Sequence, residues 1–138
     1  MNTIDNFIAY LRSKVGNLYV WGAQGECLSC IIDPEGYIQK EETSERNANR
    51  AIALYRKRVA EGMNPIEAYD CSGLIVKFLL DNKLIKADVS SRGLYSMCTK
   101  IERKDLKPGD LVFRHNGVRI YHVGAYVGDS KVIESMGR

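Results

Sequence analysis

The chain has 138 residues, a length that suits one domain with one hydrophobic core. Hydrophobic residues make up 45% of the chain and charged residues 27%, which excludes intrinsic disorder and a collagen-like composition. The net charge of +3 is too small to indicate a nucleic-acid-binding protein, and no apolar run reaches the ~20 residues that span a bilayer. We therefore expect a globular domain with no nucleic-acid partner and no integral membrane association.

The first part of the chain predicts a helix followed by a loop. Residues 2–15 carry apolar side chains at helical spacing, with Thr3 as the candidate N-cap and Gly16 as the stop signal. A short apolar run, Leu18 to Trp21, follows. Glycines, cysteines and a proline then interrupt residues 22–36, which predicts mostly loop there.

Three further helices are predicted in the middle of the chain. Ser44 is a candidate cap for a helix that runs to Glu61, because apolar side chains form one stripe along it. From Asp70 onward the pattern predicts a buried helix that ends in a polar run. Ser90 and Ser91 are candidate caps for one further short helix.

The last part of the chain predicts an antiparallel sheet. Lys107 to Asp110 reads as a turn, and three segments rich in Val, Ile, Tyr and Phe follow it: Leu111–His115, Arg119–Val127 and Lys131–Ser135. Short turn signals separate these segments, so we expect a meander of neighbouring strands. Helices followed by strands predict the α+β fold class.

The strongest candidate for chemistry is Cys71, which follows Asp70 at the start of the central helix. At a helix N-terminus the unpaired backbone N–H groups and the helix dipole favour the thiolate, which is the nucleophilic form. The same N–H groups can bind an oxyanion. The alternative, on these residues alone, is that Cys71 is a small buried hydrophobic residue.

A thiol nucleophile needs a base, and the chain has two histidines. His115 precedes an Asn-Gly turn signal and reads as an exposed loop residue. His122 lies within an apolar strand, where period-two alternation places it on one face with Gly124. A histidine in such a strand needs a polar partner. We therefore expect His122 to be the base.

Glu134 is the candidate partner of His122. Suppose that a three-residue loop, Gly128 to Ser130, joins the last two predicted strands, so that Val127 pairs with Lys131. The numbers of any two residues paired across these strands then sum to 258, which places Glu134 opposite Gly124. The carboxylate then lies diagonal to His122 and can orient the imidazole. A loop of even length would place Glu134 on the opposite face, and the alternative reading is a solvated strand residue.

Four sequence blocks in this order resemble the NlpC/P60 family. They are Tyr19-Val20-Trp21-Gly22, Asp70-Cys71-Ser72-Gly73, Leu106-Lys107-Pro108-Gly109-Asp110-Leu111-Val112-Phe113 and His122-Val123-Gly124-Ala125-Tyr126-Val127-Gly128. The resemblance implies a papain-like α+β fold in which a central catalytic helix packs on the antiparallel sheet. It also implies a cysteine peptidase that cleaves peptidoglycan stem peptides between D-γ-glutamate and the following diamino acid.

The resemblance also implies roles for individual residues. Cys71 would be the nucleophile and His122 the base, with Glu134 in the place of the third, orienting residue. The candidate substrate-binding residues are Tyr19, near the oxyanion, with Trp21, Asp70 and Ser72. No metal and no cofactor is implied.

The chain departs from the family pattern in three ways. The third position is most often histidine in the family, and here it is Glu134, a carboxylate that can serve the same orienting role. A long separation between Tyr19 and Cys71 indicates that residues 26–66 are an insertion within a single domain, 1–138. Family domains usually continue beyond the position of Arg138, which leaves open that the chain is a fragment of a longer protein.

Other functions share these motifs. A papain-like amidase or acyltransferase would use the same acyl-enzyme, and a non-catalytic wall-binding module could keep the scaffold. Cys27 and Cys30 form a C-x-x-C pair, for which loop thiols or a local disulfide are favoured over a zinc or redox site.

The first ten residues lack the layout of a signal peptide, so action at the cell wall would need release by lysis or injection, or export within a larger protein. Nothing in the sequence indicates an oligomeric state.

Overall fold

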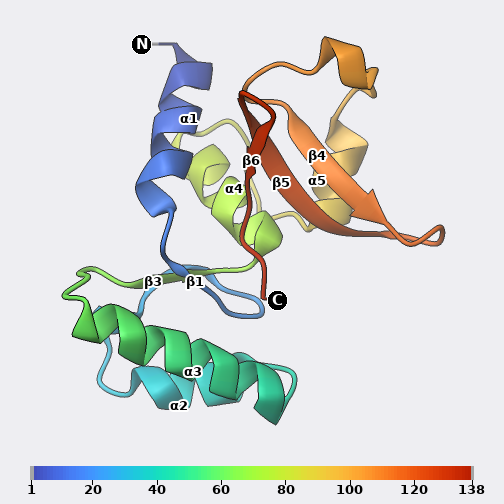
Figure 1. Ribbon diagram of the computed structural model, residues 1–138. Helices are drawn as coiled ribbons and strands as arrows, with labels where there is room; N and C mark the ends of the chain where they lie inside the picture. Colours follow the sequence, from blue (N-terminus) through green and yellow to red (C-terminus); the bar gives the residue numbers. More distant parts are fainter. Residues whose placement is uncertain (1, 138) are drawn as a thin grey trace.

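Helices dominate the first two thirds of the chain and strands the last third, so the predicted α+β class is confirmed (Figure 1). The computed structural model describes residues 2–137. The helices are α1 (Thr3–Lys14), α2 (Pro34–Glu41), α3 (Glu45–Ala60), α4 (Cys71–Asp81) and α5 (Ser91–Met97), with short 3₁₀ turns at Leu28–Cys30 and Arg103–Asp105. The strands are β1 (Leu18–Tyr19), β2 (Gln24–Cys27), β3 (Glu67–Tyr69), β4 (Leu111–His115), β5 (Ile120–Gly128) and β6 (Lys131–Ile133).

Strands β4, β5 and β6 form the predicted antiparallel meander. Helix α4 packs against β5, as the prediction of a central helix on a sheet requires. A second, smaller sheet in the order β1-β3-β2 was not predicted. Its strands are two to four residues long, which is too short to give a periodic hydrophobic signal.

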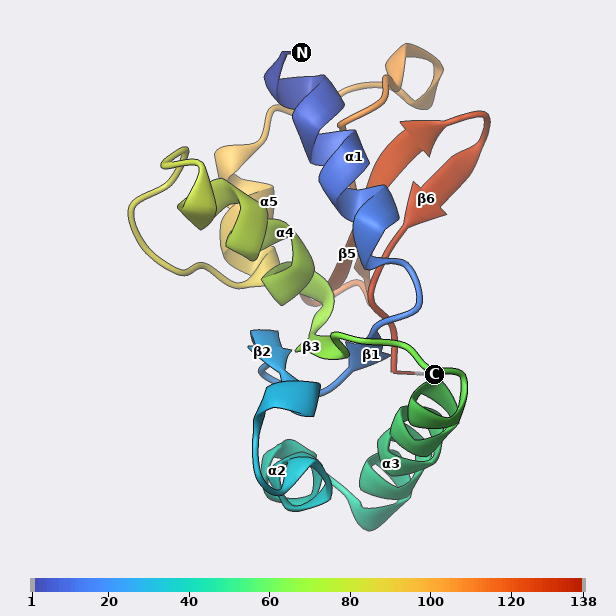
Figure 2. The same cartoon turned by 90° about the vertical axis from the view of Figure 1, so that its left-hand side faces the viewer.

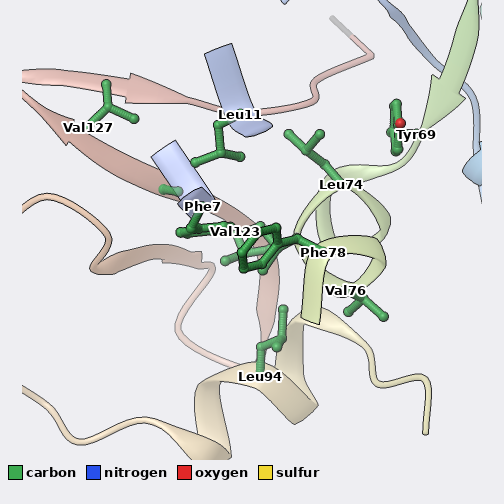
Figure 3. Packing of buried hydrophobic residues seen from close by; sticks show 11 residues of the cluster. Phe7, Leu11, Tyr69, Leu74, Val76, Phe78, Leu94, Val123 and Val127 are labelled. Atoms are coloured by element: carbon green, nitrogen blue, oxygen red, sulfur yellow. The ribbon is translucent and has the colours of Figure 1, made fainter. Parts of the chain in front are cut away.

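The main hydrophobic core lies between α1, α4 and the meander. Phe7 and Leu11 of α1 belong to it with Leu74 and Phe78 of α4 and Val123 of β5, and all five side chains are buried (Figure 3). The rings of Phe7 and Phe78 are 5.0 Å apart in a tilted arrangement. This packing fixes the start of α4 relative to β5.

A second hydrophobic cluster joins the small sheet to α2 and α3. It contains Leu18, Val20, Ala23, Leu28, Ile38, Ala48, Ala51, Ile52, Ile66 and Ala68. Figures 1 and 2 show α2 and α3 as a layer of their own on the far side of the small sheet from α4. The chain passes between the two clusters within β3, because Ala68 belongs to the second cluster and Tyr69 to the main one.

Two local predictions are wrong. Asn2, rather than Thr3, caps α1, since its side chain accepts a hydrogen bond from the backbone N–H of Asp5. Residues 22–36 are not mostly loop, because they hold β2 and begin α2. That helix follows a strong start signal that the glycines obscured: Asp33 caps it and Pro34 occupies its first turn.

The predicted caps Ser44 and Ser90 are confirmed, because each side chain accepts a backbone N–H of its helix, and Asp70 caps α4 in the same way. Within residues 2–137 no helix combines the length and the apolar composition needed to cross a membrane.

Candidate active site

A cleft of about 880 Å³ runs between the two layers of the molecule. Cys71 lines it from the start of α4, His122 lines it from β5, and Tyr19 and Trp21 line it from β1 and the turn that follows. Four of the residues singled out in the sequence therefore share one cavity. The cavity also takes side chains from α3, α5 and the β4–β5 hairpin.

Cys71 is the first residue of α4 and is partly buried. The preceding Asp70 caps the helix, because its carboxylate accepts the backbone N–H of Gly73 at 2.6 Å. The backbone N–H of Asp70 in turn donates to the carbonyl of Ala23 at 2.8 Å. The first bond caps the helix, and the second holds the helix start, and with it Cys71, against the loop before β2.

Burial raises the pKa of the Cys71 thiol above its ordinary value, and this is the largest influence on it. The backbone N–H of Val123 lowers the pKa, and the Asp70 carboxylate raises it again. The backbone N–H groups at the helix start lower the pKa, as the sequence predicts, while burial acts in the opposite direction.

His122 and Glu134 are joined by a short hydrogen bond, 2.5 Å from Nε2 to Oε1. The imidazole is buried, with 8% of the residue exposed, and Gly124 leaves room for the carboxylate because its missing Cβ would lie 3.1 Å from Cβ of Glu134. A carboxylate accepts only, so Nε2 carries the proton and Nδ1 is left as the acceptor. The imidazole is thus in the tautomer that can act as a base.

The predicted pairing sum of 258 is confirmed, since Ala125 pairs with Ile133 and Tyr126 with Val132. The predicted three-residue loop is wrong. The turn contains two residues, Asp129 and Ser130, and an irregularity between Tyr126 and Gly128 restores the register beyond it.

Asp70 and Ser72 do not line the cleft. Asp70 caps α4, and the hydroxyl of Ser72 donates to the Asp70 carboxylate at 3.4 Å. Burial raises the pKa of Asp70, with the Gly73 N–H opposing that shift. Their substrate-binding roles remain predictions from the resemblance.

Asp70→Asn separates the capping role from a substrate-binding role. Asparagine caps as well as aspartate, so we expect the free energy of unfolding in urea to change by less than about 0.5 kcal/mol, while Asp70→Ala costs about 1 kcal/mol. If Asp70 also binds a substrate amine, Asp70→Asn raises KM although stability is kept. Equal losses of stability in both variants would contradict the capping role.

Several residues that line the cleft were not predicted from the sequence as part of the site. They come from the segment 26–66, from α5 and from the hairpin, and they include Glu42, Asn47, Arg50, Leu54, Arg92, Arg114 and Arg119. On a helix or a hairpin, an arginine that faces a cleft has the same spacing as one that faces solvent. Only the packing of α3 opposite the hairpin distinguishes them.

Cys27 and Cys30 form a disulfide, with Cα atoms 5.3 Å apart. The local-disulfide reading of the C-x-x-C pair is confirmed, and Cys71 and Cys98 are free thiols. Across residues 2–137 no three His, Cys, Asp or Glu side chains are grouped so that they could hold a metal ion.

The fold and the cleft define an α+β protein with a cysteine at a helix start and a histidine–carboxylate pair on the adjoining sheet. Its residues 55–138 match the profile of the NlpC/P60 family. The chain belongs to that family, as its motifs predict.

Three curated relatives illustrate the match. The chain is 37% identical over 79 residues to "Probable endopeptidase p60" of Listeria innocua serovar 6a, covering 57% of this chain and 17% of the relative. It is 38% identical over 78 residues to "Murein DD-endopeptidase MepH" of Escherichia coli K12, covering 54% and 29%. It is 35% identical over 77 residues to "Bifunctional muramidase/DL-endopeptidase CwlT" of Bacillus subtilis 168, covering 54% and 23%. The chain therefore spans less than a third of each of these three relatives.

Proposed function

We propose that the chain is a cysteine endopeptidase that cleaves peptidoglycan stem peptides between D-γ-glutamate and the following diamino acid. The observation that supports it most directly is that Cys71 and His122 line one cleft and that Glu134, which lies outside that lining, is hydrogen-bonded to His122. The names of the relatives, endopeptidase p60 and murein DD-endopeptidase, support the same class of reaction. Family membership alone would not identify the reacting groups.

In the first half of the reaction, Nδ1 of His122 takes the proton of the Cys71 thiol, and the sulfur attacks the γ-carbonyl carbon of the glutamyl residue. The oxyanion that forms is stabilised by backbone N–H groups at the start of α4. The imidazolium then gives its proton to the leaving amine as the C–N bond breaks, which leaves a thioester on Cys71. Glu134 stabilises the imidazolium throughout.

In the second half, His122 takes a proton from water, and the oxygen attacks the thioester carbonyl. The C–S bond breaks, the sulfur regains its proton, and the γ-carboxylate of glutamate is released. Burial raises the pKa of the Cys71 thiol, and in this mechanism both halves of the reaction use His122 as the base.

The identity of the bond needs a direct test, since the names of the relatives include both a DD- and a DL-endopeptidase. Purified sacculi and the synthetic peptides L-Ala-γ-D-Glu-L-Lys and L-Ala-γ-D-Glu-meso-diaminopimelate would be incubated with the protein, with Cys71→Ala as the inactive control. Mass spectrometry of the products should show L-Ala-D-Glu and the free diamino acid. Release of other fragments would move the cut to another bond.

The same experiment separates the alternatives. A new amide between the acyl fragment and an added amine would identify an acyltransferase, because an amine would have replaced water on the thioester. Sedimentation of both wild type and Cys71→Ala with sacculi, without fragments from either, would identify a wall-binding module and overturn the proposed function.

For the whole protein we expect action at the bacterial cell wall on peptidoglycan as its partner. The insertion at 26–66 stays a prediction, and so does release by lysis, injection or export within a larger protein. The segment supplies one wall of the cleft through α3, which is why its removal would alter the substrate site rather than the nucleophile.

A further inference from the structure

The cleft carries an excess of positive charge. Four arginines line it: Arg50 on α3, Arg92 on α5, Arg114 on β4 and Arg119 before β5. Glu42 is the one carboxylate in the lining of this cleft, as far as residues 2–137 define it. Both of its oxygens already accept backbone N–H groups, from Trp21 at 3.1 Å and from Thr43 at 3.3 Å.

The arginines are not neutralised by neighbours. None of the four forms an ion pair within residues 2–137, and Arg50 donates to the neutral side chain of Asn47. By contrast Arg56, on the same helix but outside the cleft, is paired with Glu35. Four unpaired guanidinium groups from separate segments, gathered in one concave site, produce a positive potential that attracts carboxylates.

Two of these arginines lie on opposite walls of the site. Arg114 pairs directly with His122 in the β4–β5 register, so the two side chains project from the same face of the sheet. Arg50 comes from α3, which lies in the separate layer below the hairpin (Figure 1). Arg114 and Arg50 therefore reach the cleft that holds Cys71 from different segments of the chain.

We infer that the cleft selects peptides with free carboxylates next to the scissile bond, and that Arg50 and Arg114 determine this specificity. The inference rests on the proposed function and names a property of its substrate. A glutamyl residue linked through its γ-carboxyl group keeps its α-carboxylate free beside the bond. A guanidinium group binds that carboxylate with two hydrogen bonds. A primary amide in the same place has no charge, and its N–H groups would face the N–H groups of the arginine.

The test compares matched peptides that differ in one group. L-Ala-γ-D-Glu-L-Lys and L-Ala-γ-D-Glu-meso-diaminopimelate are each paired with the peptide that carries an α-carboxamide on the D-glutamyl residue. For the wild type we expect kcat/KM to be about 10- to 100-fold higher with the free carboxylate, the range of one hydrogen bond to a charged group. Raising the salt concentration should reduce the ratio.

Arg50→Gln and Arg114→Gln are each expected to lower this ratio by about tenfold, through slower cleavage of the free-carboxylate peptide alone. Arg46→Gln is the matched control, because Arg46 is exposed one turn earlier on α3 and lies outside the cleft. It should keep the ratio of the wild type. A loss of rate for both peptides alike would point to a structural role and overturn the assignment of that arginine.

A binding measurement tests this inference independently of the proposed function. Calorimetry with Cys71→Ala measures the affinity for both peptides without turnover, and the same preference for the carboxylate is expected there. Cleavage of both peptides at equal rates would overturn the inference and leave the peptidase intact. Absence of cleavage with selective binding would overturn the peptidase and leave the carboxylate preference. Equal binding, or none, would overturn the inference in either case.

Discussion

Glu134→Gln is expected to lower kcat by about 10²- to 10⁴-fold while KM changes by no more than a few-fold. Glutamine is nearly isosteric, but its amide can donate to Nε2 of His122 and so favour the tautomer with the proton on Nδ1. That imidazole cannot take the proton of the Cys71 thiol, whose pKa burial raises. The charge that stabilises the imidazolium is lost as well. Steady-state kinetics on the stem peptide would measure the change.

Asp129→Asn provides the matched control for Glu134→Gln. It also converts a carboxylate into an amide on the β5–β6 hairpin, but at an exposed turn position with a φ of 53°, which asparagine tolerates. We expect unchanged kcat and KM. If Glu134→Gln behaved like this control, Glu134 would have no orienting role and the 2.5 Å contact would be structural only.

Gly73→Ala is expected to destabilise the protein by about 3 kcal/mol and lower its Tm by about 10 °C. A Cβ at Gly73 would lie 2.2 Å from the carbonyl oxygen of Ala23 and 2.7 Å from the Asp70 carboxylate that caps α4. The first of these is a backbone atom, which cannot rotate away. Either α4 or the loop before β2 must move, so we expect the activity that depends on Cys71 to fall at temperatures where the variant is still folded.

Gly62→Ala separates steric conflict from backbone preference. Gly62 has a φ of +80° and open space around its missing Cβ, so alanine there costs about 1 kcal/mol through conformation alone. Thermal unfolding followed by circular dichroism would compare the two variants. A loss at Gly73 no larger than that at Gly62 would mean that the close approach to Ala23 is easily relaxed.

The sequence predicted those parts of the fold whose signals are local. A helix start is marked by a side chain that caps it, and Ser44, Asp70 and Ser90 all do so. The meander was predictable because β4 and β5 are rich in Val, Ile, Tyr and Phe and turn signals separate its segments. The position of Glu134 beside His122 was predicted with the correct strand register but with the wrong turn. A two-residue turn, together with the irregularity between Tyr126 and Gly128, gives the same pairing between β5 and β6 as a three-residue loop would.

The rest depends on contacts between distant segments. Strand β3 is three residues long and exists because β1 and β2 pair with it, so its own residues carry no strand signal. The raised pKa of Cys71 comes from burial, which depends on how α4 packs against β5. Arg50 and Arg114 are far apart in the sequence and share a cavity only because α3 and the hairpin face each other across it.

The passage of the chain between its two hydrophobic clusters has a consequence for how the protein can diversify. Ala68 belongs to one cluster and Tyr69 to the other, and the nucleophile follows two residues later. The sulfur of Cys71, the proposed nucleophile, thus lies beside the point where the chain passes from one packed unit to the other. A tilt of one unit against the other would change the width of the substrate channel far more than the position of the sulfur. We therefore expect substitutions within α2 and α3 to change which substrate the proposed peptidase accepts without moving Cys71.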